Sequence, residues 1–397
     1  MATVCEYTHR VFLVEVALGR LPPDPDCLTR GTLVILIEVV VASGRVGNGL
    51  SNLISEIERR LIGSAPSPGL SADLASSIPD ASTYVIALFD GLGMAQLAHP
   101  GAGSMRRSLA GPMTAPFPTT TPVSLSTVAS GVDPGLHGVV AHLLWIPELG
   151  KVVNTLKWVD LTGRPVTHDY AAMLPHPNVW ERLRKSGVEP ITVQPGAFMG
   201  SPLSRLLYRG ARFEPSWNDT DLVDATLQLA GESRRLIFTY IWQVDFAGHV
   251  SGLDSHEFED AMKMANQVWE DLATGLPPDA ALIGTADHGL IEYADDDKIL
   301  IRGDPWDRLR FGGDPRGIHL WGDIDLARDL AALTGGTLVD PETVFDPITD
   351  VARRRLGDHL VLAPPGRVLL PPGFDKRLRC YHGGLDRAES EIPLLIG

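Results

Sequence analysis

The chain has 397 residues, of which 44% are hydrophobic and 21% are charged. These proportions are typical of a globular protein and exclude a disordered or collagen-like chain. The formal net charge of −15 makes binding to a nucleic-acid duplex unfavourable, because an acidic surface repels polyanions.

The N-terminal region shows no recognisable targeting signal. Its most apolar stretch, residues 33–42, contains Glu38 and is too short to span a bilayer. The region also lacks the basic start and clean apolar run of a signal peptide. The three cysteines, Cys5, Cys27 and Cys380, have no CxxC spacing, so neither a disulfide framework nor a cysteine zinc site is indicated. We therefore expect no membrane span and a cytoplasmic location.

Two parts of the chain differ in character. Residues 1–79 carry no chemical motif and end near a run rich in Gly, Ser and Pro, residues 63–77, that is typical of a loop. We interpret residues 1–79 as an N-terminal appendage and linker. Residues 80–397 form the expected main domain.

Short apolar runs alternate with helical patterns in this main domain. The apolar runs are residues 84–89, 236–241 and 281–285, and the segments with apolar spacings near 3.6 residues are 178–185, 220–230, 255–272 and 325–333. Strands that alternate with helices predict an α/β fold, in which a central, mostly parallel sheet is covered on both faces. Smaller inserted elements are expected around residues 139–175 and 298–323.

Acidic residues and histidines follow the apolar runs. In open parallel sheets the ligand site lies beyond the carboxyl ends of the strands, so these residues are candidates for such a site. Their carboxylate and imidazole groups suit Zn²⁺ or another divalent transition metal. A gap of four residues places Asp245 and His249 on one side of a helical turn. The full set of candidates is Asp90, Asp245, His249, Asp287, His288 and His382.

Three consecutive threonines, residues 119–121, precede a helical pattern that begins near Val123. A hydroxyl at a helix N-terminus lies beside unpaired N–H groups that attract phosphate, and a nearby metal would turn it into a nucleophile. The alternative is that these threonines only cap the helix. A nicotinamide cofactor is not indicated, because Gln96 replaces the third glycine that the sequence at residues 91–93 would need for a dinucleotide-binding fingerprint.

Five short motifs occur in an order that resembles a known superfamily. The motifs are FDGLG, TTTP with GVDPGLHGV downstream, DFAGH, TADHG and HGG. Their order is similar to that of the alkaline phosphatase superfamily, and in particular of its nucleotide pyrophosphatase/phosphodiesterase branch. The resemblance covers residues 80–397 and implies an alkaline phosphatase-like fold.

The resemblance also implies roles for individual residues. Two divalent ions, Zn²⁺ or alternatively Mn²⁺, would be held by two sets of ligands. Thr121 would contact the second ion, attack phosphorus and form a covalent phosphothreonine intermediate, with Thr120 as the alternative nucleophile. The ligands of the first ion would be Asp245, His249 and His382, and those of the second Asp90, Asp287 and His288.

Some residues depart from the pattern of that branch or stand beside it. Pro122, Val123 and Ser124 follow Thr121, where the branch commonly has an aromatic residue, Pro and Asn, and His142 stands near an expected asparagine that contacts a phosphate oxygen. His142 could donate a hydrogen bond in place of that amide, or point elsewhere. Outside the ligand set, we expect a structural role for His137. For Glu389, a supporting contact to His382 is an alternative rather than the expected role.

The sequence therefore predicts a two-metal hydrolase that cleaves phosphodiester or pyrophosphate bonds in a small, nucleotide-like phosphate ester. One alternative is a phosphomonoesterase or phosphonate hydrolase of the same superfamily, and another is a non-catalytic homologue that binds metal or phosphate. A formylglycine sulfatase is disfavoured because no CxPxR segment follows Asp90. The sequence does not indicate an oligomeric state.

Overall fold

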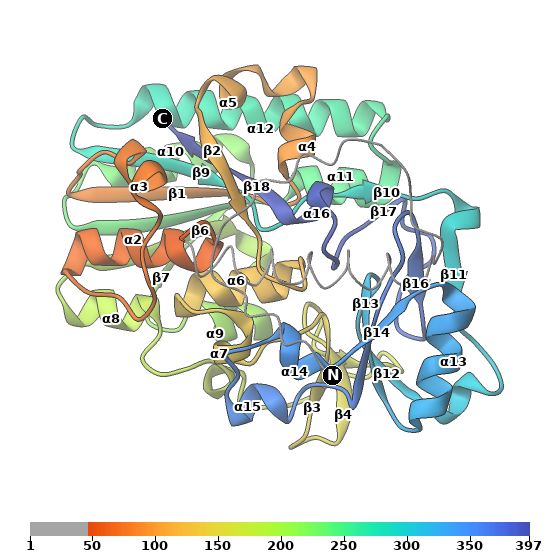
Figure 1. Cartoon of the computed structure of the whole chain (residues 1–397). Helices are drawn as coiled ribbons and strands as arrows, with labels where there is room; N and C mark the ends of the chain where they lie inside the picture. Colours follow the sequence, from red (N-terminus) through yellow and green to blue (C-terminus); the bar gives the residue numbers. More distant parts are fainter. Residues whose placement is uncertain (1–46) are drawn as a thin grey trace, which may run out of the picture.

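A seven-stranded mixed sheet forms the centre of the protein (Figure 1), and the computed structural model describes residues 47–397. The strand order is β2-β18-β9-β1-β8-β6-β7. Strands β9, β1, β8, β6 and β7 run parallel, whereas β18 pairs antiparallel with both β9 and β2. The strands are β1 (Thr83–Phe89), β2 (Leu109–Thr114), β6 (Glu189–Pro195), β7 (Arg212–Ser216), β8 (Arg235–Ile241), β9 (Ala280–Thr285) and β18 (Glu391–Ile396).

The three predicted strands, β1, β8 and β9, lie side by side in the middle of the sheet. Helices cover them on both faces. Every residue of β1 and of β8 is buried, which explains why these strands appear in the sequence as continuous apolar runs rather than as alternating patterns. Helices α10 (Asp219–Ala230) and α12 (His256–Gly275) lie on one face of the sheet, and α2 (Leu50–Ile62), α6 (Thr121–Ser130) and α8 (Val179–Lys185) lie on the other (Figure 1). The expected α/β fold is therefore confirmed.

Side-chain caps fix the start of the predicted helices. Asn178 accepts a hydrogen bond from the N–H of Glu181 at the start of α8, and Ser255 accepts one from Phe258 at the start of α12. Helix α13 (Ile324–Thr334) is capped in the same way by Asp323. The remaining helices are α3 (Ala72–Ser77), α4 (Met94–Leu97), α5 (Gly103–Arg107), α7 (Pro134–His137), α9 (Pro202–Leu207), α11 (Gln243–Ser251), α14 (Pro341–Val344), α15 (Asp350–Arg353) and α16 (Arg387–Ser390).

Helix α2 belongs to the core of the main domain, although it lies within the segment that we interpreted as appendage and linker. Its side chains Leu53 and Ile57 are fully buried in the same core cluster as β1. Its buried Glu58 forms an ion pair with the half-buried Arg182 of α8, with Nε and Oε1 2.5 Å apart. Residues 1–46 lie outside the described residues, so for them the appendage remains a prediction.

A second seven-stranded sheet was not predicted as a unit. Its order is β14-β15-β13-β12-β3-β4-β5, and all of its pairs are antiparallel. The two expected insertions meet in it, because Leu143 of β3 pairs with Gly313 of β12, and residues 337–362 extend it. The strands are β3 (Leu143–Ile146), β4 (Lys151–Asn154), β5 (Val159–Asp160), β12 (Arg310–Asp314), β13 (Gly317–Trp321), β14 (Thr337–Val339) and β15 (His359–Leu362).

Two short strand pairs complete the fold. Strand β10 (Ile291–Glu292) pairs antiparallel with β17 (Cys380–Tyr381), and β11 (Lys298–Leu300) pairs parallel with β16 (Val368–Leu370). The first of these pairs carries the chain to His382, directly after β17. Among residues 47–397, no helix is both long enough and apolar enough to cross a membrane.

Candidate metal and phosphate site

The predicted ligands gather at the carboxyl ends of three adjacent strands. Asp90 follows β1, Asp245 lies in the first turn of α11 after β8, and Asp287 follows β9. The parallel register ends these strands at one edge of the sheet, where the N–H of Asp90 donates to the carbonyl of Ile241 at 2.8 Å. The location is the one expected for a ligand site in a parallel α/β sheet.

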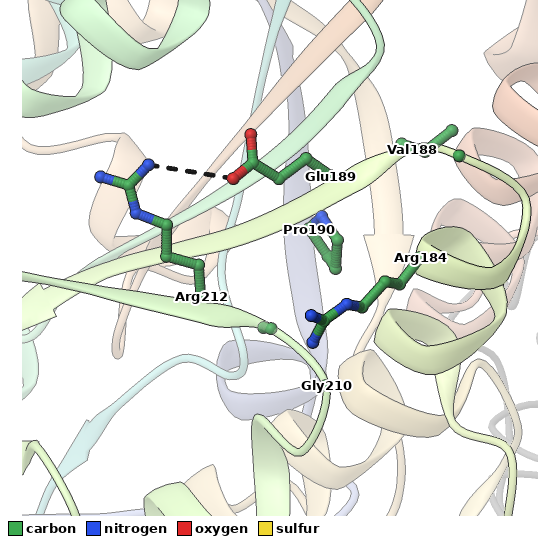
Figure 2. Close-up of a pocket in the computed structure, with 8 residues that line it drawn as sticks. Arg184, Val188, Glu189, Pro190, Gly210 and Arg212 are labelled. Carbon is green, nitrogen blue, oxygen red and sulfur yellow. Dashed lines mark ion pairs between the residues drawn. The ribbon is translucent and has the colours of Figure 1, made fainter.

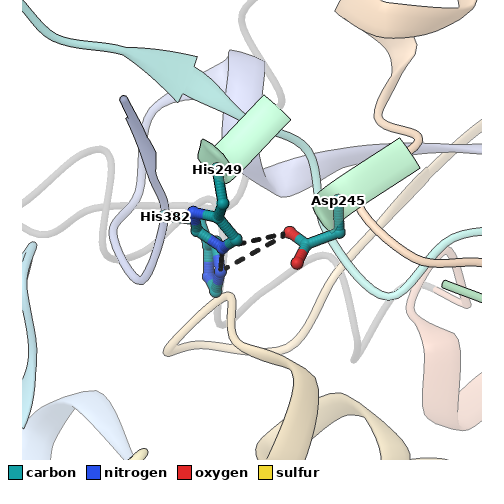
Figure 3. Close-up of side chains that lie close together, drawn as sticks. All are labelled: Asp245, His249 and His382. Atoms are coloured by element: carbon teal, nitrogen blue, oxygen red, sulfur yellow. Dashed lines mark hydrogen bonds and ion pairs between the residues drawn. The ribbon is translucent and has the colours of Figure 1, made fainter. Parts of the chain in front are cut away.

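Asp245, His249 and His382 form a first cluster (Figure 3). The Nε2 atom of His249 lies 3.2 Å from Oδ1 of Asp245 and 3.2 Å from Nε2 of His382. The distance from His382 Nε2 to the same carboxylate oxygen is 3.9 Å. All three side chains are half-buried, so a small molecule could reach this cluster from solvent.

Asp90, Asp287 and His288 form a second cluster, which is fully buried. The Nε2 atom of His288 lies 3.3 Å from Oδ2 of Asp287 and 3.6 Å from Oδ1 of Asp90. Asp245 is also within ligand distance of Asp90 and His288, so it stands between the two clusters. The six predicted ligands thus come together around one centre.

Backbone carbonyls orient the three imidazole rings. The Nδ1 atoms of His249, His382 and His288 lie 2.7, 2.8 and 3.1 Å from the carbonyl oxygens of Cys380, Thr119 and Gly289 respectively. A carbonyl only accepts, so each Nδ1 donates and each Nε2 is left as a lone-pair donor. This orientation by an outer contact is typical of metal-binding histidines.

Within residues 47–397, three carboxylate oxygens at the centre have no hydrogen-bond donor, although histidine Nε2 atoms lie near them. Oδ1 of Asp90, Oδ1 of Asp245 and Oδ2 of Asp287 are sealed from solvent and accept no hydrogen bond. The opposite oxygens are held in place: the Tyr240 hydroxyl donates to Oδ2 of Asp90, and the N–H of Gly91 donates to Oδ1 of Asp287 at 3.0 Å. Buried oxygens without a partner are costly unless a cation binds them, and a set of carboxylates and imidazoles fits divalent transition metals.

Burial and neighbouring charges shift the pKa values of several candidate ligands. Burial and then the nearby charges of Asp287 and Asp245 raise the pKa of Asp90 well above its usual value. Burial lowers the pKa of His382, as do the neighbouring His288 and His249. Burial alone would raise the pKa of Asp245, but His249 and His382 hold this pKa below its usual range. Cations between the carboxylates would relieve the repulsion.

Of the three threonine hydroxyls, that of Thr121 is the one that contacts a candidate ligand side chain, whereas Thr119 contacts His382 through its backbone carbonyl. Thr121 is the first residue of α6, and its Oγ1 lies 3.2 Å from Nε2 of His288. The Thr119 hydroxyl instead donates to the carbonyl of Gly384 at 3.1 Å, and the Thr120 side chain bonds to Asp314. Ser124 joins the first turn of α6 to the second cluster by donating to the carbonyl of Asp287 at 2.8 Å.

Glu389 does not make the supporting contact to the His382 ring that the sequence left open as an alternative. Its carboxylate accepts from Arg316 Nε at 3.2 Å and from the N–H of Gly384 at 3.0 Å, whereas His382 is oriented by the Thr119 carbonyl. Glu389 therefore stabilises the Gly383-Gly384 turn that follows His382 and does not contact the His382 ring. His137 is buried and lies 3.1 Å from the Thr127 hydroxyl, in agreement with a structural role.

Sequence reasoning missed Tyr240, Asp314 and Asn154. Tyr240 lies within a buried strand, so the sequence pattern does not distinguish it from the apolar packing residues of that run. Asp314 and Asn154 lie on β12 and β4 of the second sheet, which the sequence did not reveal. The only signal for them was the polarity of residues at the ends of short apolar runs.

A pocket of about 450 Å³ lies elsewhere (Figure 2). It is lined at the amino ends of β6 and β7, where Glu189 and Arg212 form an ion pair of 3.8 Å. None of the predicted site residues lines it. We assign it no part in the site at the opposite ends of the strands.

The fold and the site together define an α/β hydrolase of the alkaline phosphatase superfamily. The sequence model of the type I phosphodiesterase / nucleotide pyrophosphatase family matches residues 88–313, more than half of the chain. The protein belongs to this family. The match spans the candidate ligand residues that follow β8 and β9, as well as Thr121.

Solved structures with a similar fold include two kinds of enzyme. Murine ectonucleotide pyrophosphatase/phosphodiesterase 5 has 17% identity and a TM-score of 0.60, covering 78% of this chain and 87% of its own. The same mouse protein in an inactive form in complex with AMP has 16% identity, a TM-score of 0.59 and coverages of 78% and 87%. Phosphonoacetate hydrolase from Sinorhizobium meliloti has 17% identity and a TM-score of 0.61, covering 80% of this chain and 91% of its own. No curated protein sequence matches the chain.

Proposed function

We propose that the protein hydrolyses phosphodiester or pyrophosphate bonds in a small, nucleotide-like substrate, with two divalent ions bound at the clustered ligands. The observation that carries this proposal is the set of three buried, unpartnered carboxylate oxygens beside the Thr121 hydroxyl. Zn²⁺ suits the mixture of imidazole and carboxylate donors, and Mn²⁺ is the alternative.

Two ligand sets follow from the two clusters. Asp245, His249 and His382 would hold one ion, and Asp90, Asp287 and His288, together with Thr121, would hold the other. When bound, such ions neutralise phosphoryl oxygens and lower the pKa of a coordinated hydroxyl. Asp245 lies within ligand distance of both sets, so its loss should affect both ions.

Thr121 is the proposed nucleophile. After losing its proton to solvent, its Oγ1 forms a bond to phosphorus while the bond from phosphorus to the leaving oxygen breaks, and the leaving group departs as an alcohol or a phosphate. Water then hydrolyses the phosphothreonine ester and restores the hydroxyl. The positive end of the α6 dipole favours the phosphoryl group next to Thr121. This contribution does not come from free N–H groups of the next three residues, because Pro122 has none and those of Val123 and Ser124 donate to the carbonyl of Thr120.

Exposed aromatic side chains near the site favour a nucleotide-like substrate. Phe246 follows the ligand Asp245 and is 54% exposed. Trp217 follows β7 and is 74% exposed, with its ring packed over Gly196. Phe198 packs against Tyr240, which in turn contacts Asp90. Aromatic faces on this rim could stack on a base, and the AMP complex of the mouse protein supports such a ligand class.

Phosphonate hydrolysis is the second candidate, because phosphonoacetate hydrolase shares this fold to the same degree. The two reactions would use the same ligands but different leaving groups. Hydrolysis of a phosphonate breaks a phosphorus–carbon bond, whereas hydrolysis of a diester or pyrophosphate breaks a phosphorus–oxygen bond.

The test is a comparison of kcat/KM on three substrates with added Zn²⁺ or Mn²⁺: bis-p-nitrophenyl phosphate, p-nitrophenyl phosphate and phosphonoacetate. The proposal predicts that the diester is hydrolysed best. A preference for the monoester or for phosphonoacetate would establish an alternative reaction of the superfamily. Binding of two ions without turnover of any substrate would indicate a non-catalytic homologue.

A further inference from the structure

His142, directly before β3, is held by three different residues. Its carbonyl accepts hydrogen bonds from the N–H and the hydroxyl of Thr155, at 3.0 and 2.9 Å. Its N–H donates to Oδ2 of Asp314 at 3.2 Å. Its ring atom Nε2 lies 3.0 Å from Nδ2 of Asn154 on β4. The backbone and one ring nitrogen are therefore fixed.

The orientation of the Asn154 amide is determined by the turn that follows it. Its Oδ1 accepts from the N–H groups of Leu156 and Lys157 at 3.1 and 3.0 Å. Because both of these groups are donors, the amide oxygen faces them and the NH₂ group faces His142. An amide NH₂ only donates, so Nε2 of His142 must accept. The neutral ring consequently carries its proton on Nδ1.

The surroundings of His142 also keep the ring uncharged. Burial lowers its pKa to about 4, and the charges of His249 on α11 and Lys157 in the turn act in the same direction. Asp314 on β12 contacts the backbone rather than the ring, and burial raises the pKa of this carboxyl to about 8. The remaining neighbour is the ring of Phe374, 6.1 Å away between centroids.

His142 is connected to the segment that carries the proposed nucleophile. Asp314 joins His142 to Thr120, the residue before the proposed nucleophile, and the charge of the ligand His249 acts on the ring. The side chain is half-buried. Within residues 47–397, Nδ1 is the polar atom of His142 to which the structure gives no partner, so its N–H is available to a ligand.

We propose that His142 is a permanently neutral hydrogen-bond donor to a non-bridging phosphoryl oxygen, that Asn154 fixes its tautomer, and that this pair selects phosphoryl groups with one negative charge. A neutral N–H gains little from the second charge of a monoester, whereas an imidazolium would form a stronger, charge-assisted bond to it. The inference rests on the proposed function and names the residues that make the site prefer diesters over monoesters.

The substitution Asn154→Asp tests this inference. The carboxylate has nearly the same shape as the amide, and one of its oxygens can still accept from Leu156 and Lys157. Its other oxygen replaces the NH₂ group and stabilises a proton on Nε2, which makes His142 an imidazolium. We expect the ratio of kcat/KM for p-nitrophenyl phosphate to that for bis-p-nitrophenyl phosphate to rise about tenfold. An unchanged ratio in the folded, metal-loaded variant would overturn the inference.

A matched set of variants separates charge from shape. His142→Asn retains a neutral donor and should preserve the substrate ratio of the wild-type protein. Adding Asn154→Asp to His142→Asn should leave that ratio unchanged, because no imidazole remains to be charged. A tenfold change in this double variant would contradict the inference.

The tautomer itself can be measured without turnover. In ¹⁵N-histidine-labelled protein loaded with Zn²⁺, the signal that disappears in His142→Asn should be that of a neutral ring protonated on Nδ1, unchanged from pH 5.5 to 8. A ring protonated on Nε2, or one that titrates in this range, would overturn the inference. Absence of any hydrolysis by the wild-type protein would instead refute the proposed function, so the two failures are distinguishable.

Discussion

The Tyr240 hydroxyl donates a hydrogen bond to Oδ2 of Asp90 and thereby joins β8 to the end of β1. This contact leaves Oδ1 of Asp90 as the unpartnered oxygen that faces the other ligands. A residue that orients a ligand in this way contributes to metal affinity without touching the metal.

We therefore predict that Tyr240→Phe weakens binding of one ion by roughly tenfold or more. Competition with a chromogenic chelator measures the affinity of each ion. The matched control is Tyr84→Phe, which removes a hydroxyl at the other end of β1, where it donates to the carbonyl of Pro79 and accepts from the N–H of Ala81. Equal affinities in the two variants would show that the contact does not orient Asp90.

Thr121→Ala should lower diesterase kcat/KM by roughly a thousandfold or more, because the nucleophile is lost while the carboxylate and imidazole ligands remain. Thr120→Ala should have a much smaller effect, since the Thr120 side chain contacts Asp314 rather than His288. Acid quenching during turnover followed by peptide mass spectrometry should find phosphate on Thr121. Phosphate on Thr120 would identify the alternative nucleophile.

The pH dependence of stability should reveal the repulsion around Asp90. Its pKa is raised in the folded, metal-free protein, so the folded state binds more protons than the unfolded state above the usual carboxyl pKa. The stability that depends on Asp90 is therefore lost as the pH rises from the usual carboxyl pKa through the raised pKa of the folded state. We predict that metal-free protein unfolds at lower urea concentrations at pH 7.5 than at pH 5.5.

Asp90→Asn should reduce this pH dependence, because the amide cannot ionise. The exposed Asp254 provides the control, and Asp254→Asn should leave the dependence unchanged. Urea unfolding in the presence of a chelator measures both variants. The same slope in Asp90→Asn and wild-type protein would place the source of the dependence elsewhere.

Leu53→Ala should destabilise the protein by about 2–5 kcal/mol, because Leu53 of α2 is fully buried in the main core. Leu333→Ala removes a side chain that is 70% exposed and should change the free energy of unfolding by less than about 0.5 kcal/mol. Urea unfolding measures both. Equal stability of the two variants would show that α2 packs independently of the domain.

The sequence predicted the part of the fold whose signal is local. Buried parallel strands such as β1 and β8 are continuous apolar runs, and the residue after each run marks the edge where a site lies. The second sheet had no such signal, because its strands are short and Leu143 pairs with Gly313, about 170 residues away. Only the folded chain shows that two insertions and residues 337–362 form one sheet.

The candidate site divides in the same way. Asp245 and His249 could be identified as candidate ligands because they follow an apolar run and are spaced by one helical turn. Tyr240 could not, because a tyrosine inside a buried strand is indistinguishable from a packing residue until its hydroxyl is placed against Asp90. His142 attracted notice in the sequence, but its tautomer depends on Asn154 and on the backbone groups that orient that amide.

The central claim is that the clustered ligands bind two ions that are needed for hydrolysis. The most direct test measures the metal content of wild-type, Asp245→Ala and Asp287→Ala proteins by mass spectrometry, together with diesterase activity in the presence of Zn²⁺ or Mn²⁺. We predict about two ions per chain in the wild-type protein, fewer in each variant, and loss of activity with the lost ion. Less than one ion in the wild-type protein, or variants that match it in metal content and activity, would contradict the account.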